Sequence, residues 1–351
     1  NITPVGSETI DLNLGGSTVS ATQTATTANS ITYSYTILEN DLDTDGIAGA
    51  ASITGGIAIV DAVGNAFGNV VPTTAFASVL VDGVKPTITN VTVASATYYI
   101  GDDIDIVLTF DDNVTIAAGS PEIPFTFETM ASSPKAVYNS GTGTTTITFR
   151  YLAVNGNEDT NGVDLAASIA LAGSTIKDVN GNDSYLALSS TNFPSVLVDA
   201  ILPTVTLAAA TTIDNLSEAT YSLSGTCSEN GQTVNVNIGG VSDSDTCAAL
   251  TWSTTTDVSA ASESADNTVA DLTITVDHSD LGANAAIQAT DTVIKDSILP
   301  TISTNTIAAD TYIIGETIDM VVTFSENITP VGSETIDLNL GGSTVSATQT
   351  A

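Results

Sequence analysis

Apolar and polar residues alternate along many short stretches of this chain. Two examples are Ile104, Ile106, Leu108 and Phe110, and Val234, Val236 and Ile238. A period of two places alternate side chains on one face of a β-strand, and Gly and Asn end these stretches as they commonly end strands. Apolar spacing of the helical kind is not sustained anywhere over about 11 residues. The pattern predicts an all-β protein.

The two ends of the chain carry the same sequence. Residues 1–25 and 327–351 both read NITPVGSETIDLNLGGSTVSATQTA, and the two copies start 326 positions apart. Self-similarity at a fixed spacing is typical of repeat proteins. We therefore expect the chain to be one period of a tandem array plus an overlap, taken from a longer protein.

A second motif divides the period into three parts. It is a strand-like run followed by Asp, three residues and Pro, and its Asp residues are Asp82, Asp199 and Asp296. Successive Asp residues of this motif are each roughly 100 residues apart, and so are Asp296 and the first such Asp of the next period. This length suits Ig-type β-sandwiches. The proline fixes φ and interrupts strand pairing, so each motif predicts a short, stiff linker between domains.

Two of the three parts are similar in sequence. The matching segments are 310–327 with 96–113, 39–47 with 155–163, and 59–65 with 176–182. The part after residue 203 diverges and holds both cysteines. The sequence thus predicts the C-terminal part of a first Ig-like domain at 1–85, its sibling at 86–202, a divergent Ig-like domain at 203–299, and the start of the next copy of the first domain at 300–351.

Composition adds a strong acidic bias. The chain has 40 Asp and Glu against 5 Lys and Arg, a net charge of −35, yet 42% of its residues are hydrophobic. The mean hydropathy of +0.26 predicts buried cores rather than a disordered acidic chain. Scarce Lys and Arg argue against nucleic-acid binding. No stretch approaches the roughly 20 apolar residues of a membrane-spanning helix, so we expect no membrane insertion.

Several motifs occur together: TYYIGDDIDIVLTF from Thr97, DTDGI from Asp43, and the linker pattern VDxxxPT, first seen at Val81. In combination they resemble the bacterial Ig-like tandem repeats of giant cell-surface adhesins and related extracellular fibres. The divergent part, with SGTCSENG from Ser224 and DHSDLGAN from Asp277, is similar to a second bacterial Ig-like type. The resemblance implies tandem β-sandwich domains in an extended head-to-tail array, outside the cell and frequently stiffened by Ca²⁺ at domain junctions.

Asp41, Asp43 and Asp45, followed by Gly46, form the sharpest candidate metal site. Oxygen ligands at alternate positions before a Gly turn are typical of calcium loops. The corresponding residues of the sibling domain are Asn157, Asp159 and Asn161. This second loop carries less charge, so we expect weaker binding. The alternative is an acidic turn in which Asp and Asn bond their own backbone.

A second acidic set is expected at the domain junctions. It comprises the linker residues Asp82, Asp199 and Asp296 and the turn residues Asp61, Asp178, Asn180 and Asn182. End loops and linkers meet where sandwiches follow one another, so these side chains could share Ca²⁺, which would offset the self-repulsion of an acidic chain. The alternative is that the excess charge keeps a crowded fibre soluble.

The only two cysteines, Cys227 and Cys247, lie in the same predicted domain. In an extracellular β domain, an even count favours a disulfide over two buried thiols. A zinc site is disfavoured because the chain has a single His.

Catalytic motifs are lacking. A Ser-His-Asp arrangement would have to use His278, which we expect to be a turn residue, and the sequence has no nucleophile elbow, P-loop or dinucleotide fingerprint. We expect a non-catalytic segment of a secreted bacterial fibre or adhesin stalk, whose partners are neighbouring repeats of the same chain. The alternatives are a multivalent module that contacts glycans, cell-surface ligands or other fibres, and subunits that assemble by strand exchange.

Overall fold

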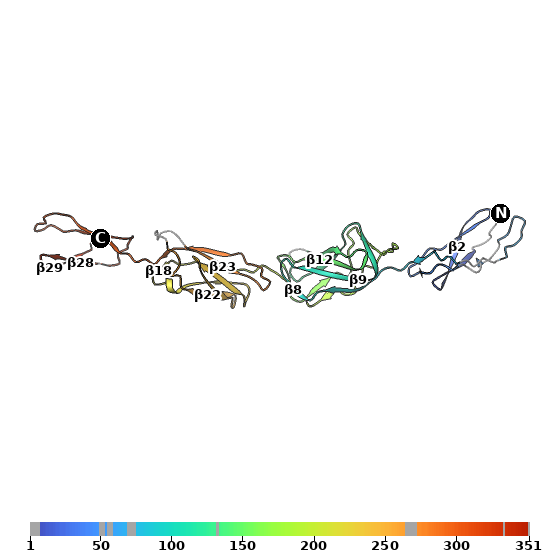
Figure 1. The fold of residues 1–351 in the computed structure, drawn as a ribbon, viewed down its shortest axis with the longest axis horizontal. Coiled ribbons are helices and arrows are strands. Elements are labelled where there is room, and N and C mark those ends of the chain that lie inside the picture. The colour runs from blue at the N-terminus through green and yellow to red at the C-terminus, as the bar shows by residue number, and fades with distance from the viewer. Residues whose placement is uncertain are drawn as a thin grey trace. The chain divides into compact units, whose positions relative to one another are not determined.

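The computed structural model describes residues 8–48, 53–54, 59–68, 75–130, 133–263, 272–332 and 334–349. The chain divides into two compact units, Asn1–Ile201 and Leu202–Ala351, which are described separately below (Figure 1). The described residues form strands and one short 3-10 helix and contain no α-helix, which confirms the predicted all-β class. None of their helices has the length and hydropathy to cross a bilayer.

The first part of unit 1 contains a four-stranded sheet of order β3–β2–β1–β5 and a short pair, β4 with β6. The bounds are β1 (Thr9–Leu14), β2 (Ser17–Thr26), β3 (Ile31–Ser34), β4 (Leu42–Asp43), β5 (Ile53–Thr54) and β6 (Val81–Asp82). Leu14 and Ala21 are buried, whereas Leu38, Leu42 and Leu80 are largely exposed.

The second part of unit 1 is a β-sandwich. One sheet has the order β15–β9–β12–β11–β10–β14–β16, with β7 also paired to β9, and the other has the order β13–β17–β8. The bounds are β7 (Ile88–Val93), β8 (Ala96–Tyr98), β9 (Asp103–Ala117), β10 (Glu122–Thr126), β11 (Lys135–Ser140), β12 (Thr144–Leu152), β13 (Asn157–Asp159), β14 (Val163–Leu165), β15 (Thr175–Lys177), β16 (Asn192–Phe193) and β17 (Val196–Ala200).

Both sheets of this sandwich bury side chains in one core. Ile104 and Ile106 of β9 and Phe149 of β12 meet Val196 and Val198 of β17. The four predicted inward positions of residues 104–110 are all at most 3% exposed, so the predicted strand and its buried face are confirmed. The core runs from residue 88 to residue 200 and thus lies between the first two linker prolines.

Unit 2 begins with a second sandwich. Its sheets are β21–β20–β23–β24 and β19–β22, with a parallel pair β18–β25 at one end. The bounds are β18 (Ile213–Asp214), the 3-10 helix η1 (Glu218–Thr220), β19 (Tyr221–Thr226), β20 (Thr233–Ile238), β21 (Val241–Thr246), β22 (Thr251–Thr256), β23 (Leu272–His278), β24 (Ala289–Val293) and β25 (Lys295–Asp296). Its core runs from residue 205 to residue 293, and the predicted inward residues of β20 are fully buried.

The rest of unit 2 forms two separate strand pairs. They are β26 (Ile302–Ile307) with β27 (Met320–Phe324), and β28 (Thr335–Leu340) with β29 (Ser343–Thr348). The second pair repeats the sequence of β1 and β2, yet Leu340 is 50% exposed where Leu14 is 3% exposed. The same hairpin therefore forms twice; among the described residues β3 and β5 pair with the first copy, and β28 and β29 pair with each other alone.

Candidate functional sites at the domain ends

Asp43, in the middle of the predicted calcium loop, serves as a hydrogen-bond acceptor for the backbone. Its Oδ2 accepts the N–H of Gly15 at 2.8 Å, and its Oδ1 accepts the N–H groups of Gly46 at 2.7 Å and Asp45 at 3.3 Å. The Gly15 donor, followed by the Gly46 and Asp45 donors, holds the pKa of Asp43 below its ordinary value against the opposing effect of burial. The carboxylate thus stabilises the turn and ties it to the hairpin β1–β2.

Asp41 and its counterpart Asn157 both accept a tyrosine hydroxyl. Asp41 Oδ2 lies 2.8 Å from the Tyr35 hydroxyl and 2.7 Å from the Leu38 N–H. Asn157 Oδ1 lies 2.7 Å from the Tyr151 hydroxyl and accepts a backbone N–H of its own turn at 3.1 Å. Because a neutral amide performs the same role as the carboxylate, the position needs an acceptor and does not need a charge.

Asp159 repeats the contacts of Asp43 in a different electrostatic setting. Its Oδ1 accepts the N–H groups of Gly162 at 2.6 Å and Asn161 at 3.3 Å. Burial is the main cause of a raised pKa of Asp159: it outweighs the lowering effect of the Gly162 and Asn161 donors, and the nearby Glu128 carboxylate adds to the rise. Glu128 in turn accepts the Asn161 amide at 2.6 Å and the Thr160 hydroxyl at 2.6 Å. Sequence reasoning missed Glu128, because it lies in a segment far from the loop.

The glycine that ends each acidic motif is required by close packing. Gly46 and Gly162 have φ of +105° and +109°, in the left-handed region. A Cβ on Gly46 would lie 2.4 Å from Cα of Ala77, and a Cβ on Gly162 would lie 2.3 Å from Cα of Pro194. The glycine of each motif is therefore explained by a turn that packs closely against a neighbouring backbone.

An Asp and an Asn four positions later form the same turn in three places. The Asn backbone N–H and the Asn side-chain amide both donate to the Asp carboxylate at 2.7–2.9 Å. The pairs are Asp61 with Asn65, Asp178 with Asn182, and Asp280 with Asn284. The Asn65 amide is the main cause of a lowered pKa of Asp61. The third pair was missed by the sequence analysis, although its spacing was visible, and it shows that the divergent domain shares this turn.

The second of these turns meets the linker between the first two domains. The side-chain amide of Asn180 donates to Asp82 Oδ2 at 2.5 Å, and that of Asn182 donates to the Asp82 carbonyl at 3.1 Å. Burial tends to raise the pKa of Asp178, but the donors of Asn182 and of the turn backbone more than offset it and lower the pKa. The structure thus brings together four of the residues predicted at this junction: Asp82, Asp178, Asn180 and Asn182.

The preceding domain holds the other side of the same linker. The Gly83 N–H donates to the Asp41 carbonyl at 2.7 Å, and the Gly83 carbonyl accepts the Asn40 N–H at 2.9 Å. Lys85 lies 3.5 Å from the Glu39 carboxylate and 5.3 Å from the centre of the Tyr185 ring. The Tyr185 hydroxyl also donates to Glu39. Residues 81–86, the predicted linker, are therefore bonded to both parts of unit 1.

An open groove of about 740 Å³ lies beside this linker. Its lining combines exposed apolar side chains with the polar residues of the junction. The lining includes Leu38, Leu42, Leu80, Asp43 and Lys85.

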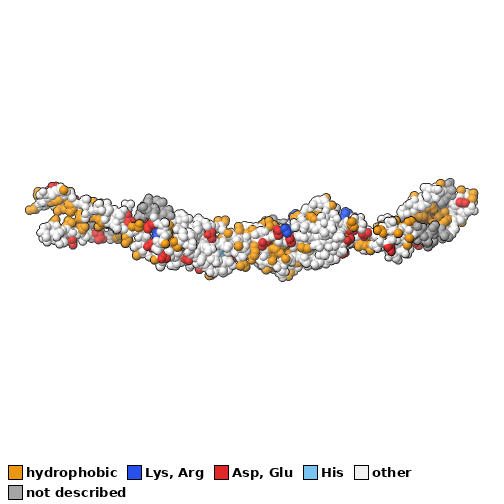
Figure 2. All heavy atoms as spheres, in the orientation of Figure 1, with side chains coloured by type: hydrophobic (Ala, Val, Ile, Leu, Met, Phe, Trp, Pro, Cys, Tyr) orange, Lys and Arg blue, Asp and Glu red, His pale blue; other side chains and the backbone are white. Residues whose placement is uncertain are grey.

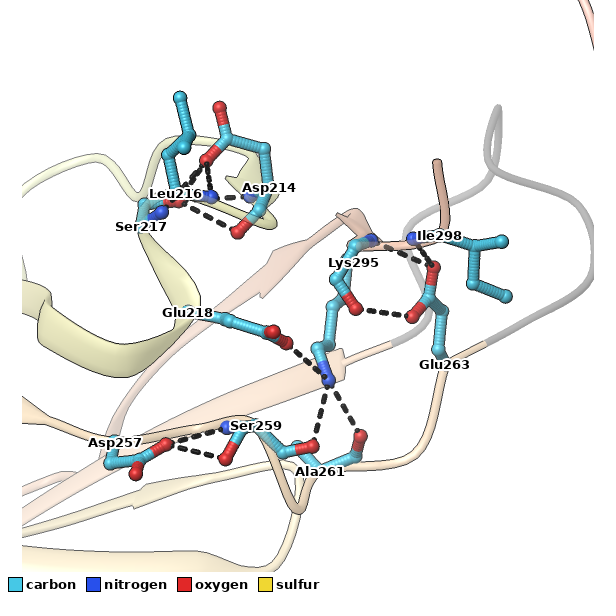
Figure 3. Close-up of polar contacts among 11 residues, drawn as sticks. Asp214, Leu216, Ser217, Glu218, Asp257, Ser259, Ala261, Glu263, Lys295 and Ile298 are labelled. Atoms are coloured by element: carbon cyan, nitrogen blue, oxygen red, sulfur yellow. Dashed lines mark hydrogen bonds and ion pairs between the residues drawn. The ribbon is translucent and has the colours of Figure 1, made fainter. Parts of the chain in front are cut away.

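In unit 2, a buried lysine fixes the start of the last linker (Figure 3). Lys295 in β25, with a side chain 3% exposed, lies 3.3 Å from the Glu218 carboxylate and donates to the carbonyls of Ser259 at 3.2 Å and Ala261 at 3.0 Å. The linker residues that follow are bonded separately: Glu263 accepts the Ser297 N–H and hydroxyl, both at 2.8 Å. The 3-10 helix, the 257–263 segment and β25 are thereby joined where the linker leaves the domain.

The remaining predicted linker residues, Asp199 and Asp296, lie at the ends of strands. Asp199 lies opposite Glu158 in the β13–β17 pair, and Asp296 lies opposite Asp214 in the β18–β25 pair. Both have further interactions within the chain. Each therefore belongs to a paired strand that leads into a linker.

The two cysteines and the single histidine stabilise the core of unit 2. Cys227 and Cys247 form a disulfide, and the nearby Trp252 is 2% exposed and donates its indole N–H to the Thr206 carbonyl at 3.0 Å. His278 ends β23, where its Nε2 accepts the Glu229 N–H at 3.2 Å and its Nδ1 faces the Thr233 carbonyl at 3.1 Å. His278 is thus a buried strand residue rather than the turn residue we expected.

The carboxylate oxygens at these loops accept hydrogen bonds from backbone and side-chain donors. Within the described ranges no group of three or more His, Cys, Asp and Glu side chains is placed to hold a metal ion. The Asp43 and Asp178 carboxylates accept backbone N–H groups, and these hydrogen bonds stabilise the turns. Calcium binding stays a prediction, to be tested by titration.

Charge on the chain is largely uncompensated. All five basic residues form ion pairs with acidic side chains, namely Lys85, Lys135, Arg150, Lys177 and Lys295. Figure 2 shows few Lys and Arg side chains among many Asp and Glu on the visible face. The 40 acidic residues thus far outnumber the cations available to pair with them.

No family model and no curated protein sequence matches the chain. Among solved structures, it is similar to the fibronectin(III)-like modules of Clostridium thermocellum CbhA (18% identity, TM-score 0.25, 59% of this chain and 95% of that one). It is also similar to the I9–I11 tandem of titin (9%, 0.23, 74% and 82%). A third is Bacteroides ovatus SGBP-B in complex with a mixed-linkage heptasaccharide (12%, 0.19, 90% and 69%). These TM-scores are too low to assign a fold or a function, so the fold rests on the sheets and cores described above.

Proposed function

We propose that the chain is a structural, non-catalytic segment of a stalk or fibre on the outside of a bacterial cell. The observation that carries the proposal is the repeat. β1–β2 and β28–β29 have the same sequence and the same register, from Thr9 opposite Thr22 and Thr335 opposite Thr348 onward. A unit used again at a fixed spacing adds length, whereas a unique ligand site needs to be built only once.

The linker contacts support a mechanical role. Gly83 is bonded to the domain before it, and Asp82 is bonded to Asn180 and Asn182 of the domain after it. Glu263 and Lys295 hold the start of the last linker in a similar manner. Linkers bonded in this way transmit tension between domains and restrict bending, which suits a spacer.

A length series tests this proposal. Polypeptides of one, two and three periods are compared by small-angle scattering, with the one-period chain as the reference. We expect the maximum dimension to grow by a constant increment with each added period. A dimension that grows only as the cube root of mass would mean that the domains collapse on one another, and the stalk proposal would fail.

The groove beside the first linker favours a second candidate, a binding module. Leu38, Leu42 and Leu80 are 60%, 46% and 61% exposed there, close to Asp43 and Lys85. Apolar side chains next to polar groups are typical of ligand sites, and repetition would multiply a weak contact. A glycan array probed with the whole chain tests this candidate. Binding that is lost on Leu80→Asp and kept on Leu250→Asp, at an exposed site in unit 2, would support it.

A further inference from the structure

Four buried side-chain oxygen atoms of the first domain have no hydrogen-bond partner in the part of the chain that the structure describes. They are both carboxylate oxygens of Glu8, the amide oxygen of Gln23 and the hydroxyl of Tyr33. Glu8, directly before β1, is 0% exposed. A buried carboxylate without a partner strongly destabilises a fold, so this group of oxygen atoms requires a compensating charge.

The three side chains belong to neighbouring segments of one sheet. The Gln23 N–H donates to the Glu8 carbonyl at 3.2 Å, and Gln23 of β2 lies opposite Tyr33 of β3. Gln23 follows the buried Ala21 by two positions and thus lies on the same, inner face of the sheet. Its amide nitrogen donates to the Thr26 hydroxyl at 2.8 Å, which leaves the amide oxygen as a free acceptor. The pKa of Tyr33 is raised, first by burial and then by the charge of Glu8, so the carboxylate lies within electrostatic reach of the phenol.

The sibling domain fills the same three places without free oxygen atoms. There the Tyr138 N–H donates to the Pro121 carbonyl at 2.9 Å, and Tyr138 lies opposite Phe149 with the two rings packed edge to face. The corresponding residues are Glu8 with Pro121, Gln23 with Tyr138, and Tyr33 with Phe149. None of the three sibling side chains leaves a buried polar atom unpartnered. Three adjacent positions of the first domain thus carry free oxygen atoms where its sibling has a closed core.

The basic residues of the chain do not neutralise Glu8. The chain has five Lys and Arg, and each of them pairs with another carboxylate. The ion pairs are Lys85 with Glu39, Lys135 with Glu122, Arg150 with Asp103 and Asp105, Lys177 with Asp183, and Lys295 with Glu218. A net charge of −35 also attracts cations from solution towards the chain. The compensating charge for Glu8 therefore comes from a dissolved cation.

We infer that Glu8, Gln23 and Tyr33 form an internal cation site of the first domain, distinct from the predicted acidic loops, and that its ion is Ca²⁺. A bidentate carboxylate and a side-chain amide oxygen are common calcium ligands. Of the roughly 6–8 oxygen ligands that Ca²⁺ takes, the site supplies four, and water or backbone carbonyls supply the rest. The set contains no His or Cys, which zinc and softer metals prefer. The ion joins β1, β2 and β3 from inside the domain.

Terbium luminescence in the whole chain tests the site directly. Tb³⁺ substitutes for Ca²⁺ and emits when an excited tyrosine lies beside it, so Tyr33 reports its own ligand. We expect emission that Ca²⁺ displaces and that falls several-fold in Glu8→Gln and in Tyr33→Phe, which installs the residue of the sibling domain. Glu334→Gln is the matched control, because it changes the same position in the second copy of the hairpin, where Glu334 is exposed.

Tyr35→Phe separates this site from the predicted loop at Asp41. The Tyr35 hydroxyl donates to Asp41 at 2.8 Å, so a terbium ion in that loop would depend on Tyr35. Emission that falls in Tyr35→Phe and stays unchanged in Tyr33→Phe would overturn the inference. Equal losses in Glu8→Gln and Glu334→Gln would also overturn it, because they would show unspecific binding to an acidic surface.

Amide hydrogen exchange of β2 distinguishes a bound ion from a merely buried acid. At a Ca²⁺ concentration ten times the dissociation constant, linkage predicts about tenfold greater protection of the wild-type chain and of Glu334→Gln. We expect a smaller increase in Glu8→Gln, and without Ca²⁺ this variant should be protected at least as well as the wild type, because it removes an unpaired buried charge. An equal increase in Glu8→Gln, or no increase in the wild type, would overturn the inference. Either result leaves the stalk proposal intact, since that proposal rests on the repeat.

Discussion

Asp178→Asn tests whether the acidic turns are built by hydrogen bonds to a charged acceptor. Asp178 Oδ1 accepts the N–H groups of Asn180, Gly181 and Asn182 at 2.6–2.9 Å, and its Oδ2 accepts the Asn182 amide at 2.8 Å. An Asn at this position keeps one acceptor oxygen, but its NH₂ group would face the side-chain amide of Asn182, which is also a donor. Hydrogen bonds to charged groups contribute about 1.5–3 kcal/mol and neutral ones about 0.5–1.5, so we expect a loss of about 1–3 kcal/mol in the free energy of unfolding of the second domain.

Asp159→Asn in the same domain is the matched control. Its carboxylate is buried beside Glu128 and has a raised pKa, whereas Asp178 has a lowered pKa. An Asn at 159 can still accept the Gly162 N–H and removes a charge that burial disfavours. We therefore expect the control variant to lose no stability at neutral pH and to gain a small amount.

Amide hydrogen exchange of β9 and β12 in the whole chain measures both variants, because these strands report the opening of the second domain. The pH dependence adds a second readout. A carboxyl whose pKa is lowered by folding stabilises the folded state above its unfolded pKa of about 3.9, and this stabilisation is lost as the pH falls through the folded pKa. The stability deficit of Asp178→Asn should therefore shrink in acid. Because the pKa of Asp159 is raised, its charged carboxylate destabilises the fold at neutral pH. In acid this carboxyl is neutral in both the folded and the unfolded state, so the gain of Asp159→Asn should also vanish. Equal losses in both variants, or no loss in Asp178→Asn, would refute the reasoning.

Three further predictions concern the other sites. Lys295→Met should destabilise the divergent domain by about 3 kcal/mol or more, because it leaves Glu218 unpaired, whereas Lys135→Met at an exposed ion pair should cost under about 1 kcal/mol. Chemical denaturation measures both variants, and equal losses of stability would contradict the prediction. Reducing the Cys227–Cys247 disulfide should cost about 3 kcal/mol and should move the Trp252 fluorescence transition to lower denaturant; an unmoved transition would contradict it. Ca²⁺ should raise the melting temperature and EDTA should reverse the rise, as the calcium site predicted at Asp41, Asp43 and Asp45 requires; a melting temperature that neither Ca²⁺ nor EDTA changes would contradict that site.

The strands and their buried faces could be predicted because each depends on neighbouring residues. Ile104 and Phe110 share a face by the two-residue period of any strand, and the Gly and Pro positions mark the ends of strands and linkers. Sequence similarity between the first two domains also predicted which turns correspond. These signals are local or repeated, so they survive without knowledge of the tertiary contacts.

The chemistry of the acidic loops could not be predicted in the same way. Asp-rich turns that bind calcium and those that bond their own backbone use the same residues. The choice depends on donors such as the Gly15 N–H, which approaches Asp43 from a hairpin 28 residues earlier. Glu128 beside Asp159 and Glu218 beside Lys295 likewise become neighbours only through folding.

Single-molecule pulling on a two-period chain tests the mechanical role most directly. At about 3.3–3.6 Å per residue, the Asp82–Asp199 interval corresponds to an extended length of about 390–420 Å, the Asp199–Asp296 interval to about 320–350 Å, and the interval that closes the period to about 370–400 Å. We expect separate unfolding events whose released lengths approach these three values and recur in each period. Extension with no resolved events, or one event for the whole chain, would contradict a stalk built from independently folded domains.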